Sequence, residues 1–497
     1  MGARRSRLTA SPLACYGAPP MPPLPCLLGG TLAARARCSA ALAVAALGAG
    51  CNAAPPGSSS APVTLAPRFV DAALACDEAG GVYAAGTERF ETTNQIFVAH
   101  SKRYGESWSP RFHYVNTSVA GERGRPHLAA GAPGEVYVLW EDTRHGKVDL
   151  FFNRSLDGGE SWLEADVQLN TGVVPSLHLA APILRCDRRG NIYVVWRDEA
   201  EGFVAFYINS SHDRGSSWFE TPVAITGVST AEKAAPDLVC DDTGSLLLGW
   251  CELQAGVPGI YVNASVDHGA TWQWENQYLG RPLVGSRLPR PALALSPTGA
   301  AFAAWLTSAG VLFTRSHDQG RSWEAAPQRL PTGGYPTQPQ MHIDRFGHLY
   351  IVWQAVAADA SSFFSLRTSA DDGATFVETR VPRTGGWHLV APAGFQEPAF
   401  VPFRSGADAA GNFYLTWTEG DPGIRGIGFD RVSNYGALWL GLTRNLNLAS
   451  HLPATPEAPL LCVGDTGHVY LLWNEGHTLT VASSPFYGDS GWSYEHF

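Results

Sequence analysis

The chain has 497 residues, of which 16% are charged, and it contains 53 glycines, 35 prolines and 16 tryptophans. Abundant glycine and proline without long helical periodicity predict an all-β protein. The formal net charge is −10, and the first 51 residues hold five arginines and no acidic residue, so the remainder is more acidic still. Such a surface excludes nucleic acid as a natural partner.

The N-terminal 51 residues have the features of an export signal. Arg35 and Arg37 precede an apolar stretch, 40–50, that is too short to span a bilayer permanently. The stretch continues into Cys51, and the segment LGAGC resembles a bacterial lipoprotein cleavage box, although Leu47 lies four residues before the cysteine instead of three. We expect lipid attachment at Cys51, which would be the only contact with a membrane; plain secretion is the alternative.

Residues 52–66 are expected to form a tether outside the folded part of the protein. This Pro/Ser-rich segment (NAAPPGSSSAP and the residues after it) cannot bury a core. Within it, residues 62–65 resemble an outer strand, and we expect them to complete the last sheet of the fold. Translation starts at either Met1 or Met21.

From residue 67 to residue 497 one sequence unit is repeated eight times at intervals of about 50 to 60 residues. Each unit has a glycine followed by a short apolar run, and the run usually ends in a tryptophan. A continuous apolar run of this length, rich in β-branched and aromatic residues, predicts a strand buried on both faces. The runs end at Gly86, Trp140, Trp196, Trp250, Trp305, Trp353, Trp417 and Trp473.

A turn of the form Ser-x-Asp-x-Gly-x-x-Trp follows the run in most units. Intact copies start at Ser155, Ser211, Ser265 and Ser316, and the copy at Ser369 has Phe376 in place of tryptophan. Weaker copies start at Ser101, Val432 and Tyr487. Each unit is then expected to contain four antiparallel strands; in the third unit these are 182–186, 192–196, 204–208 and 218–225. Eight such units predict a single eight-bladed β-propeller, with seven blades as the fallback.

These turns resemble the Asp-box, or bacterial neuraminidase repeat, of sialidases, sortilin-type receptors and some glucanases. The resemblance covers residues 67–497 and implies a sialidase-like propeller with the boxes between third and fourth strands. In physical terms the box is a folding device, in which the aspartate accepts backbone N–H groups and the glycine makes the turn. A calcium site on the box aspartates lacks the clustered extra carboxylates that it would need. The box aspartates are Asp157, Asp213, Asp267, Asp318 and Asp371.

The resemblance to sialidases implies an arginine triad for the substrate carboxylate and a tyrosine nucleophile paired with a glutamate. The Arg-Ile-Pro motif of that family is absent. The nearest substitutes are Arg125 and Arg290, which directly precede prolines at the start of first strands. Glu397 resembles the glutamate of the pair, and Tyr335 is the candidate tyrosine. Each could equally be a solvated loop residue.

Acidic residues recur two positions after the end of the apolar run. If these strands end at one rim, the carboxylates form an incomplete ring there, which would bind saccharides or cations. The alternative is a hydrogen-bonded rim that ties neighbouring blades together. The residues are Glu88, Asp142, Asp198, Glu252, Glu419 and Glu475.

Five cysteines follow Cys51, an odd number that does not suggest a disulfide framework. Four of them occur near the ends of first strands and are expected to be small core residues. No zinc-type spacing is present, and we expect neither a metal nor a cofactor. The four are Cys76, Cys186, Cys240 and Cys462.

The sequence leaves two functions open. The first is a noncatalytic module in the bacterial cell envelope that binds a glycan or protein at its central face. The second is an exo-acting glycosidase of the sialidase type, so enzymatic activity stays undecided. Fold resemblance alone does not choose between them. The oligomeric state is equally open, and a monomer is compatible with the sequence.

Overall fold

The computed structural model describes residues 69–171, 179–283, 288–358, 361–382, 403–421, 424–439, 444–446, 459–475, 478–485 and 487–496. They belong to one compact unit, residues 65–497. Within these ranges no helix is long and apolar enough to cross a membrane. The signal sequence, Cys51, the tether and Glu397 lie outside the described residues.

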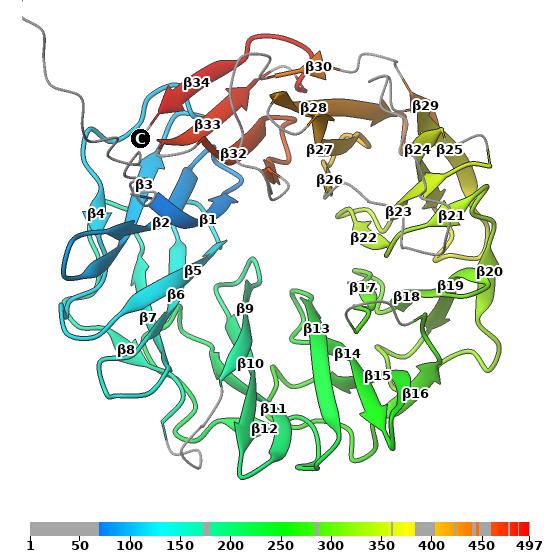
Figure 1. The fold of residues 1–497 in the computed structure, drawn as a ribbon, viewed down its shortest axis with the longest axis horizontal. Helices are drawn as coiled ribbons and strands as arrows, with labels where there is room; N and C mark the ends of the chain where they lie inside the picture. The colour runs from blue at the N-terminus through cyan, green and yellow to red at the C-terminus, as the bar shows by residue number, and fades with distance from the viewer. Residues whose placement is uncertain are drawn as a thin grey trace, which may run out of the picture. The chain divides into compact units, whose positions relative to one another are not determined.

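The fold is an eight-bladed β-propeller of antiparallel sheets, as the repeat predicted (Figure 1). The first four blades contain, in chain order, β1 (Phe69–Cys76), β2 (Val82–Arg89), β3 (Asn94–Ser101) and β4 (His113–Tyr114); β5 (Arg123–Ala130), β6 (Val136–Asp142), β7 (Asp149–Ser155) and β8 (Val167–Gln168); β9 (Ala180–Cys186), β10 (Ile192–Ala200), β11 (Phe203–Ser211) and β12 (Val223–Ala224); and β13 (Glu232–Cys240), β14 (Leu246–Gln254), β15 (Val257–Ser265) and β16 (Gln277–Gly280).

The other four blades have the same pattern with small additions. They contain β17 (Ala292–Leu295), β18 (Ala301–Thr307), β19 (Gly310–Ser316) and β20 (Gln328–Leu330); β21 (Tyr335–Pro336), β22 (Gln340–Ile343), β23 (Leu349–Val356), β24 (Ser362–Ser369) and β25 (Val377–Pro382); β26 (Phe403–Ala407), β27 (Phe413–Asp421), β28 (Ile424–Ser433), β29 (Leu438–Trp439) and β30 (Arg444–Asn445); and β31 (Leu460–Val463), β32 (Val469–Glu475), β33 (Thr478–Ser484) and β34 (Ser493–His496). In blade six, β21 and β22 both pair with β23.

The first strand of each blade, or β22 in blade six, lies next to the central opening, and the ring is closed through these inner strands (Figure 1). Each contacts the inner strand of the following blade, and β31 of blade eight contacts β1 of blade one. In blade eight the outer position is occupied by β34. Residues 62–65, which the sequence predicted there, lie outside the described residues.

The core consists of eight apolar clusters, one at each interface between neighbouring blades. The tryptophans that end the apolar runs are fully buried in six blades, which confirms that these strands are covered on both faces. At the last interface Phe69 and Phe97 of blade one pack with Leu472 and Val481 of blade eight. No blade therefore buries its faces alone.

The strands lie where the sequence predicted them, but their lengths differ: in the third unit β10 and β11 have nine residues each instead of the five expected, and the fourth strand is shorter than expected. In the third unit the expected strand over 218–225 is reduced to β12. Pro222 directly precedes β12 and has no N–H to donate to a ladder, so regular pairing starts only after it.

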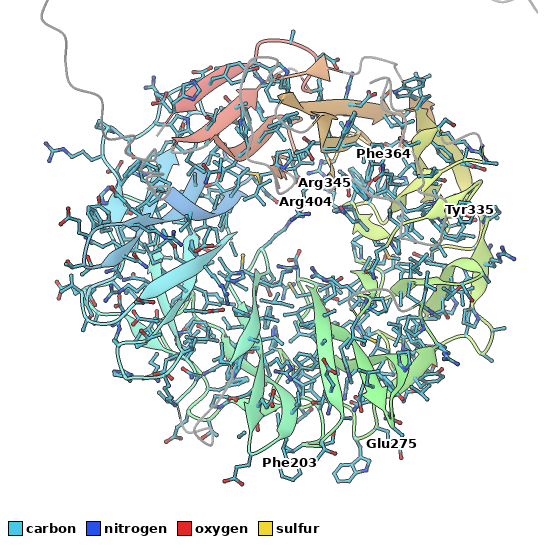
Figure 2. All side chains as sticks on the ribbon, viewed as in Figure 1. Phe203, Glu275, Tyr335, Arg345, Phe364 and Arg404 are labelled. Atoms are coloured by element: carbon cyan, nitrogen blue, oxygen red, sulfur yellow. A yellow bond between two sulfur atoms is a disulfide. The ribbon has the colours of Figure 1, made fainter. Side chains whose placement is uncertain are left out.

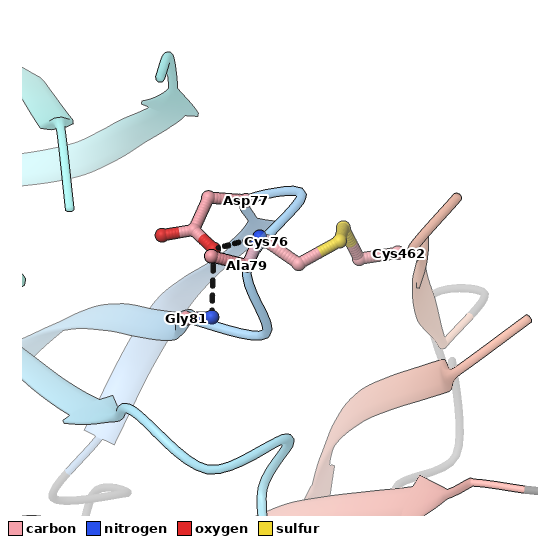
Figure 3. The surroundings of a disulfide bond; sticks show 5 residues. All are labelled: Cys76, Asp77, Ala79, Gly81 and Cys462. Carbon is pink, nitrogen blue, oxygen red and sulfur yellow. Dashed lines mark hydrogen bonds between the residues drawn. A yellow bond between two sulfur atoms is a disulfide. The ribbon is translucent and has the colours of Figure 1, made fainter. Parts of the chain in front are cut away.

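The ring is also closed covalently, because Cys76 at the end of β1 forms a disulfide with Cys462 on β31, 386 residues later (Figure 3). The prediction that these two cysteines are reduced core residues was wrong. Cys186 and Cys240 are free, and their sulfurs lie near backbone carbonyls, as expected for packed thiols. The pairing escaped local reasoning because its two members are adjacent only once the ring is closed.

The five repeated turns are built identically. In each, the serine Oγ donates to the aspartate Oδ1 at 2.6 to 2.9 Å and accepts the glycine N–H. The aspartate also accepts the backbone N–H and the hydroxyl of the residue four positions later. Sequence reasoning missed this hydroxyl partner, although a serine or threonine precedes the aromatic residue in all five copies. The five are Ser161, Ser217, Thr271, Ser322 and Thr375.

These hydrogen bonds predict a stability loss in acid. Partial desolvation alone would raise the pKa of Asp157, but the bonds from Ser161 and Ser155 outweigh it and lower the pKa to about 2. In Asp371 the bonds from Thr375 have the same effect. A folded-state pKa below the unfolded value gives stability that is present above about pH 4 and is lost as the pH falls towards 2. We expect the melting temperature to drop across this window.

The control is the Asp157→Asn, Asp371→Asn double variant, which cannot take up protons at these two turns. Its melting temperature should fall less between pH 4 and pH 2 than that of the wild type. Equal slopes in the two proteins would show that the turn carboxylates do not contribute to acid unfolding.

Candidate functional site

The central channel has two ends with different chemistry. We call the end where the first strands begin the loop mouth, and the end with the short turns between first and second strands the turn mouth. At the turn mouth, the carboxylates of Asp77 and Asp187 accept hydrogen bonds from backbone N–H groups and a tyrosine hydroxyl, and Asp187 also accepts one from the Asn191 side chain. Gly190 in one of these turns has a φ of 84°, which glycine adopts without strain.

The turn mouth contains a cavity of about 340 Å³ beside the Cys76–Cys462 disulfide. Ion pairs link residues of four blades around it: Arg188 binds Glu78 at 2.9 Å and Asp465 at 3.5 Å, and Arg345 lies 3.8 Å from Asp465. Figure 2 shows Arg345 at the central opening. This end of the channel therefore has its charged side chains engaged with one another.

The loop mouth is bordered by backbone bulges in four successive first strands. A register shift in each pairing accompanies one residue in the left-handed region, with φ values of 50° to 55°. Such a backbone conformation costs about 1 to 3 kcal/mol and is common at functional sites. A bulge also changes the direction in which the side chains next to it point. Blades three and four use alanine here, whereas blades one and two place a carboxylate and a guanidinium. The four residues are Asp71, Arg125, Ala181 and Ala235.

Asp71, Arg125 and Glu141 form a polar group at this mouth. Arg125 Nη1 lies 3.1 Å from Glu141 Oε2, and the Arg125 N–H donates to Asp71 Oδ2 at 3.3 Å. Burial raises the pKa of Glu141, the Arg125 charge opposes this, and the Asp71 charge adds to it. The guanidinium itself is largely exposed. The exposed guanidinium of Arg125 can therefore donate hydrogen bonds to a ligand, and the neighbouring carboxylates of Asp71 and Glu141 can accept them.

Arg290, the second predicted arginine, lies in a separate ion pair on the opposite part of the mouth. Its Nη2 lies 2.6 Å from Asp237 Oδ1 of blade four, and its backbone N–H donates to Gln338 Oε1 at 2.9 Å. Arg125 and Arg290 thus occupy blades two and five, and each has its own carboxylate. The third candidate, Tyr335, is 71% exposed on β21 and lies towards the outside of the ring in Figure 2.

Two half-buried histidines lie on inner strands, His127 in blade two near Arg125 and His342 in blade six. His127 lies two residues beyond Arg125, and His342 Nε2 lies 2.8 Å from Ser405 Oγ. Desolvation lowers the pKa of each to about 4, so both are neutral at pH 7. The Ser405 hydroxyl donates to Gln340 Oε1 at 2.7 Å. Sequence reasoning missed Gln340 and Ser405, because neither belongs to a repeated motif.

The acidic series after the apolar runs does not form an accessible ring in the described structure. Glu88, Asp142, Asp198 and Glu252 are all at least 95% buried. Their place two residues after the tryptophan puts the carboxylate on the same side of the strand as the indole. Asp142 accordingly accepts the Trp140 N–H at 3.3 Å, and Glu252 the Trp250 N–H at 3.0 Å. The prediction of a binding ring is therefore corrected for these four buried residues, and the alternative, a hydrogen-bonded rim, holds for Glu88, Asp142 and Glu252.

The indole N–H groups follow the acidic series only in part. In blades five and six, which have Thr307 and Ala355 in place of an acid, Trp305 and Trp353 have no acceptor for this group within the described structure, but Trp196 has none either, although Asp198 follows it. In blade one, where the apolar run ends in Gly86 instead of a tryptophan, Glu88 accepts the Tyr114 hydroxyl at 2.6 Å on the outer strand. The side chains of Glu419 and Glu475 are outside the described part of the chain.

Within the described ranges no group of three or more histidine, cysteine, aspartate or glutamate side chains could hold a metal ion. Asn153, Asn209 and Asn263 match a glycosylation pattern in sequence, but they are buried and bonded to strand backbone. They recur because each asparagine has the same place in the repeat, two residues before the serine of the turn.

No family model and no curated protein matches this chain. Among solved structures, it is similar to the Hadza microbial sialidase Hz136, with 15% identity, 67% of this chain and 72% of that chain covered and a TM-score of 0.37. It is similar to an ulvan lyase of polysaccharide lyase family 25, with 10% identity, 87% and 94% covered and a TM-score of 0.39. It is also similar to the Trypanosoma rangeli sialidase, with 13% identity, 87% and 84% covered and a TM-score of 0.32. The assignment of eight blades rests on the strand pairing of this chain itself.

Proposed function

We propose that this protein is an Asp-box, sialidase-like propeller of the bacterial cell envelope, anchored through Cys51, that binds a glycan at the loop mouth without cleaving it. The observation that carries the proposal is the group formed by Asp71, Arg125 and Glu141 on two bulged blades. It lies at the open end of a closed ring, where a ligand reaches it without any change in the core.

A glycan fits the chemistry of this group. Sugar hydroxyls donate and accept at once, so they pair with carboxylates and with a guanidinium that has free N–H groups. The largely exposed Arg125 keeps such donors available, while Glu141 fixes its position. The neutral His127 adds a donor and an acceptor farther along the channel wall. A polyanionic ligand is disfavoured because the chain is acidic overall.

A second candidate is an exo-acting glycoside hydrolase of the sialidase type. The raised pKa of Glu141 favours it, because a carboxyl that keeps its proton to a higher pH than usual is better suited to act as a general acid. Arg125 would then bind the substrate carboxylate, and roles for Arg290, Tyr335 and Glu397 stay proposals. The separate ion pairs of Arg125 and Arg290 favour the binding function.

An array of immobilised glycans, probed with residues 52–497, tests the proposed function. Arg125→Ala should weaken the preferred glycan about 10- to 100-fold, since a hydrogen bond to a charged group contributes about 1.5 to 3 kcal/mol. Arg188→Ala is the matched control, because this arginine is also half-exposed and ion-paired but lies at the turn mouth. Equal losses in the two variants would contradict a site at the loop mouth.

The same protein preparations separate binding from catalysis. We expect no release of fluorophore from a sialic acid aglycone. Turnover that is abolished by Glu141→Gln or Glu397→Gln, with glycan binding retained, would replace the binding function with the hydrolase.

A further inference from the structure

Blade four departs from the repeat at one surface position. Two residues after the aromatic residue of the turn, blades two, three and six carry Glu164, Glu220 and Glu378, and blade five carries Ala325. Blade four carries Trp274, which is 98% exposed. The turns of blades two, three, five and six carry glutamate or alanine at this position, so folding does not explain a fully exposed indole in blade four.

The loop that holds Trp274 is tied to two blades. The backbone N–H of Gln273 donates to Asn263 Oδ1 at 3.0 Å, and its side chain donates to the Arg321 carbonyl of blade five, also at 3.0 Å. Asn276, on the other side of Trp274, accepts from Asn263 at 2.9 Å. Figure 2 shows the neighbouring Glu275 at the outer edge of the ring. The indole is thus presented on a fixed support.

A cavity of about 170 Å³ lies beside this loop, between blades four and five. Tyr278, a second exposed aromatic residue, borders it from β16, and Trp323 and Glu324 border it from the turn of blade five. Tyr278 packs on Tyr261 with ring centroids 5.3 Å apart, which fixes its orientation. We call the surface formed by Tyr278, Thr314, Trp323 and Glu324 at this cavity, together with Trp274 on the adjoining loop, the outer groove.

A shorter side chain in blade five than in the preceding blades accounts for the cavity. Two residues before the turn serine, blades two to four carry an asparagine, and those of blades two and four bind the backbone just after the turn. Blade five carries the shorter Thr314, which leaves space where that amide would lie. Thr314 is 1% exposed, and its Oγ1 has no partner in the described structure. A buried hydroxyl without a partner is costly and indicates an absent ligand or water.

We propose that the outer groove binds one uncharged sugar ring of a glycan chain, at a site separate from the loop mouth. The apolar face of a sugar ring can lie on the flat, exposed indole of Trp274 or on the ring of Tyr278. Its hydroxyls can bond Thr314 Oγ1, which an apolar ligand would leave unpaired, and Glu324, whose Oε1 also binds Arg315 Nε at 2.7 Å. The Glu324 carboxylate and the nearby Glu275 disfavour acidic sugars. The inference goes beyond the proposed function and does not depend on Arg125.

Two variants test the outer groove without disturbing the fold, because each restores what other blades carry. Trp274→Glu introduces the residue of blades two, three and six, and Thr314→Asn introduces that of blades two to four. The measurement is retardation in native gels that contain mannan, xylan, dextran or galactan, four soluble neutral polysaccharides. The wild type should be retarded by at least one of them, and each variant should lose at least 10-fold in apparent affinity.

The controls separate this site from the loop mouth and from unfolding. Glu220→Ala, at the register position of Trp274 in blade three, should leave the retardation unchanged. The melting temperature of Thr314→Asn should be equal to that of the wild type or higher, because the new amide fills the cavity. Absence of retardation in all four gels, or retardation that persists in either groove variant, would overturn the proposal. Loss in Arg125→Ala alone would instead assign the binding to the loop mouth.

Discussion

Replacing Cys462 with serine is expected to lower the free energy of unfolding by about 4 kcal/mol, the upper part of the usual range for a disulfide. In the chain-entropy description the benefit of a cross-link grows with the loop that it closes, and this bond joins residues 386 positions apart. It also joins the two blades at which the ring would otherwise open. Guanidinium-induced unfolding of the Cys462→Ser variant and of the wild type, both without reductant, measures this difference in the free energy of unfolding.

The matched control is Cys240→Ser, which removes a free thiol at the end of the corresponding strand in blade four. It should change the free energy of unfolding far less, and added reductant should destabilise the wild type and the Cys240→Ser protein but not the Cys462→Ser protein. Insensitivity of the wild type to reductant would show that the cross-link does not stabilise the ring.

Replacing Asp142 with asparagine is expected to cost about 3 kcal/mol, because it leaves a buried cation without its counter-charge. The side chains of Asp142 and Arg123 are both completely buried, with Arg123 Nε 3.2 Å from Asp142 Oδ2. Arg144 binds the same oxygen at 2.6 Å and continues to Asp166 at 2.8 Å. The Arg123 guanidinium also donates to the Asn94 carbonyl of blade one, so the network ties two blades.

Glu141→Gln provides the comparison, since Glu141 is the preceding residue on β6 and its partner Arg125 is largely exposed. Exposed pairs contribute about 0 to 1 kcal/mol, so this variant should unfold almost as the wild type does. Thermal and denaturant unfolding of both variants make the test. An Asp142→Asn protein of unchanged stability that has lost glycan binding would restore the binding ring that the sequence predicted.

The fold could be predicted because its signals are local and repeated. The glycine before each run, the buried tryptophan and the serine–aspartate turn each recur at a fixed spacing, so every copy checks the others. The binding ring was a misinterpretation of an equally regular signal. The carboxylates at this position in blades one to four are buried, and those of Asp142 and Glu252 accept the indole N–H of the preceding tryptophan. Sequence regularity alone does not distinguish such burial from exposure at a rim.

Features that occur once were harder to predict. The bulge that turns Asp71 towards Arg125 depends on backbone geometry that no repeated residue marks. The Cys76–Cys462 bond depends on ring closure. Trp274 was different, because aligning the turns shows a tryptophan where three other blades have glutamate. A departure from the repeat was therefore the signal that could have located the outer groove.

The seam between the first and the last blade has a consequence for synthesis on the ribosome. Phe69 and Phe97 are covered by residues of blade eight, which emerge almost 400 residues later. At a translation rate of about 5 to 20 residues per second, this apolar face stays uncovered for roughly 20 to 80 s. Until blade eight has been made, the growing chain is thus an open arc that ends in an exposed apolar face. Chaperones are needed to keep this face from binding other nascent chains.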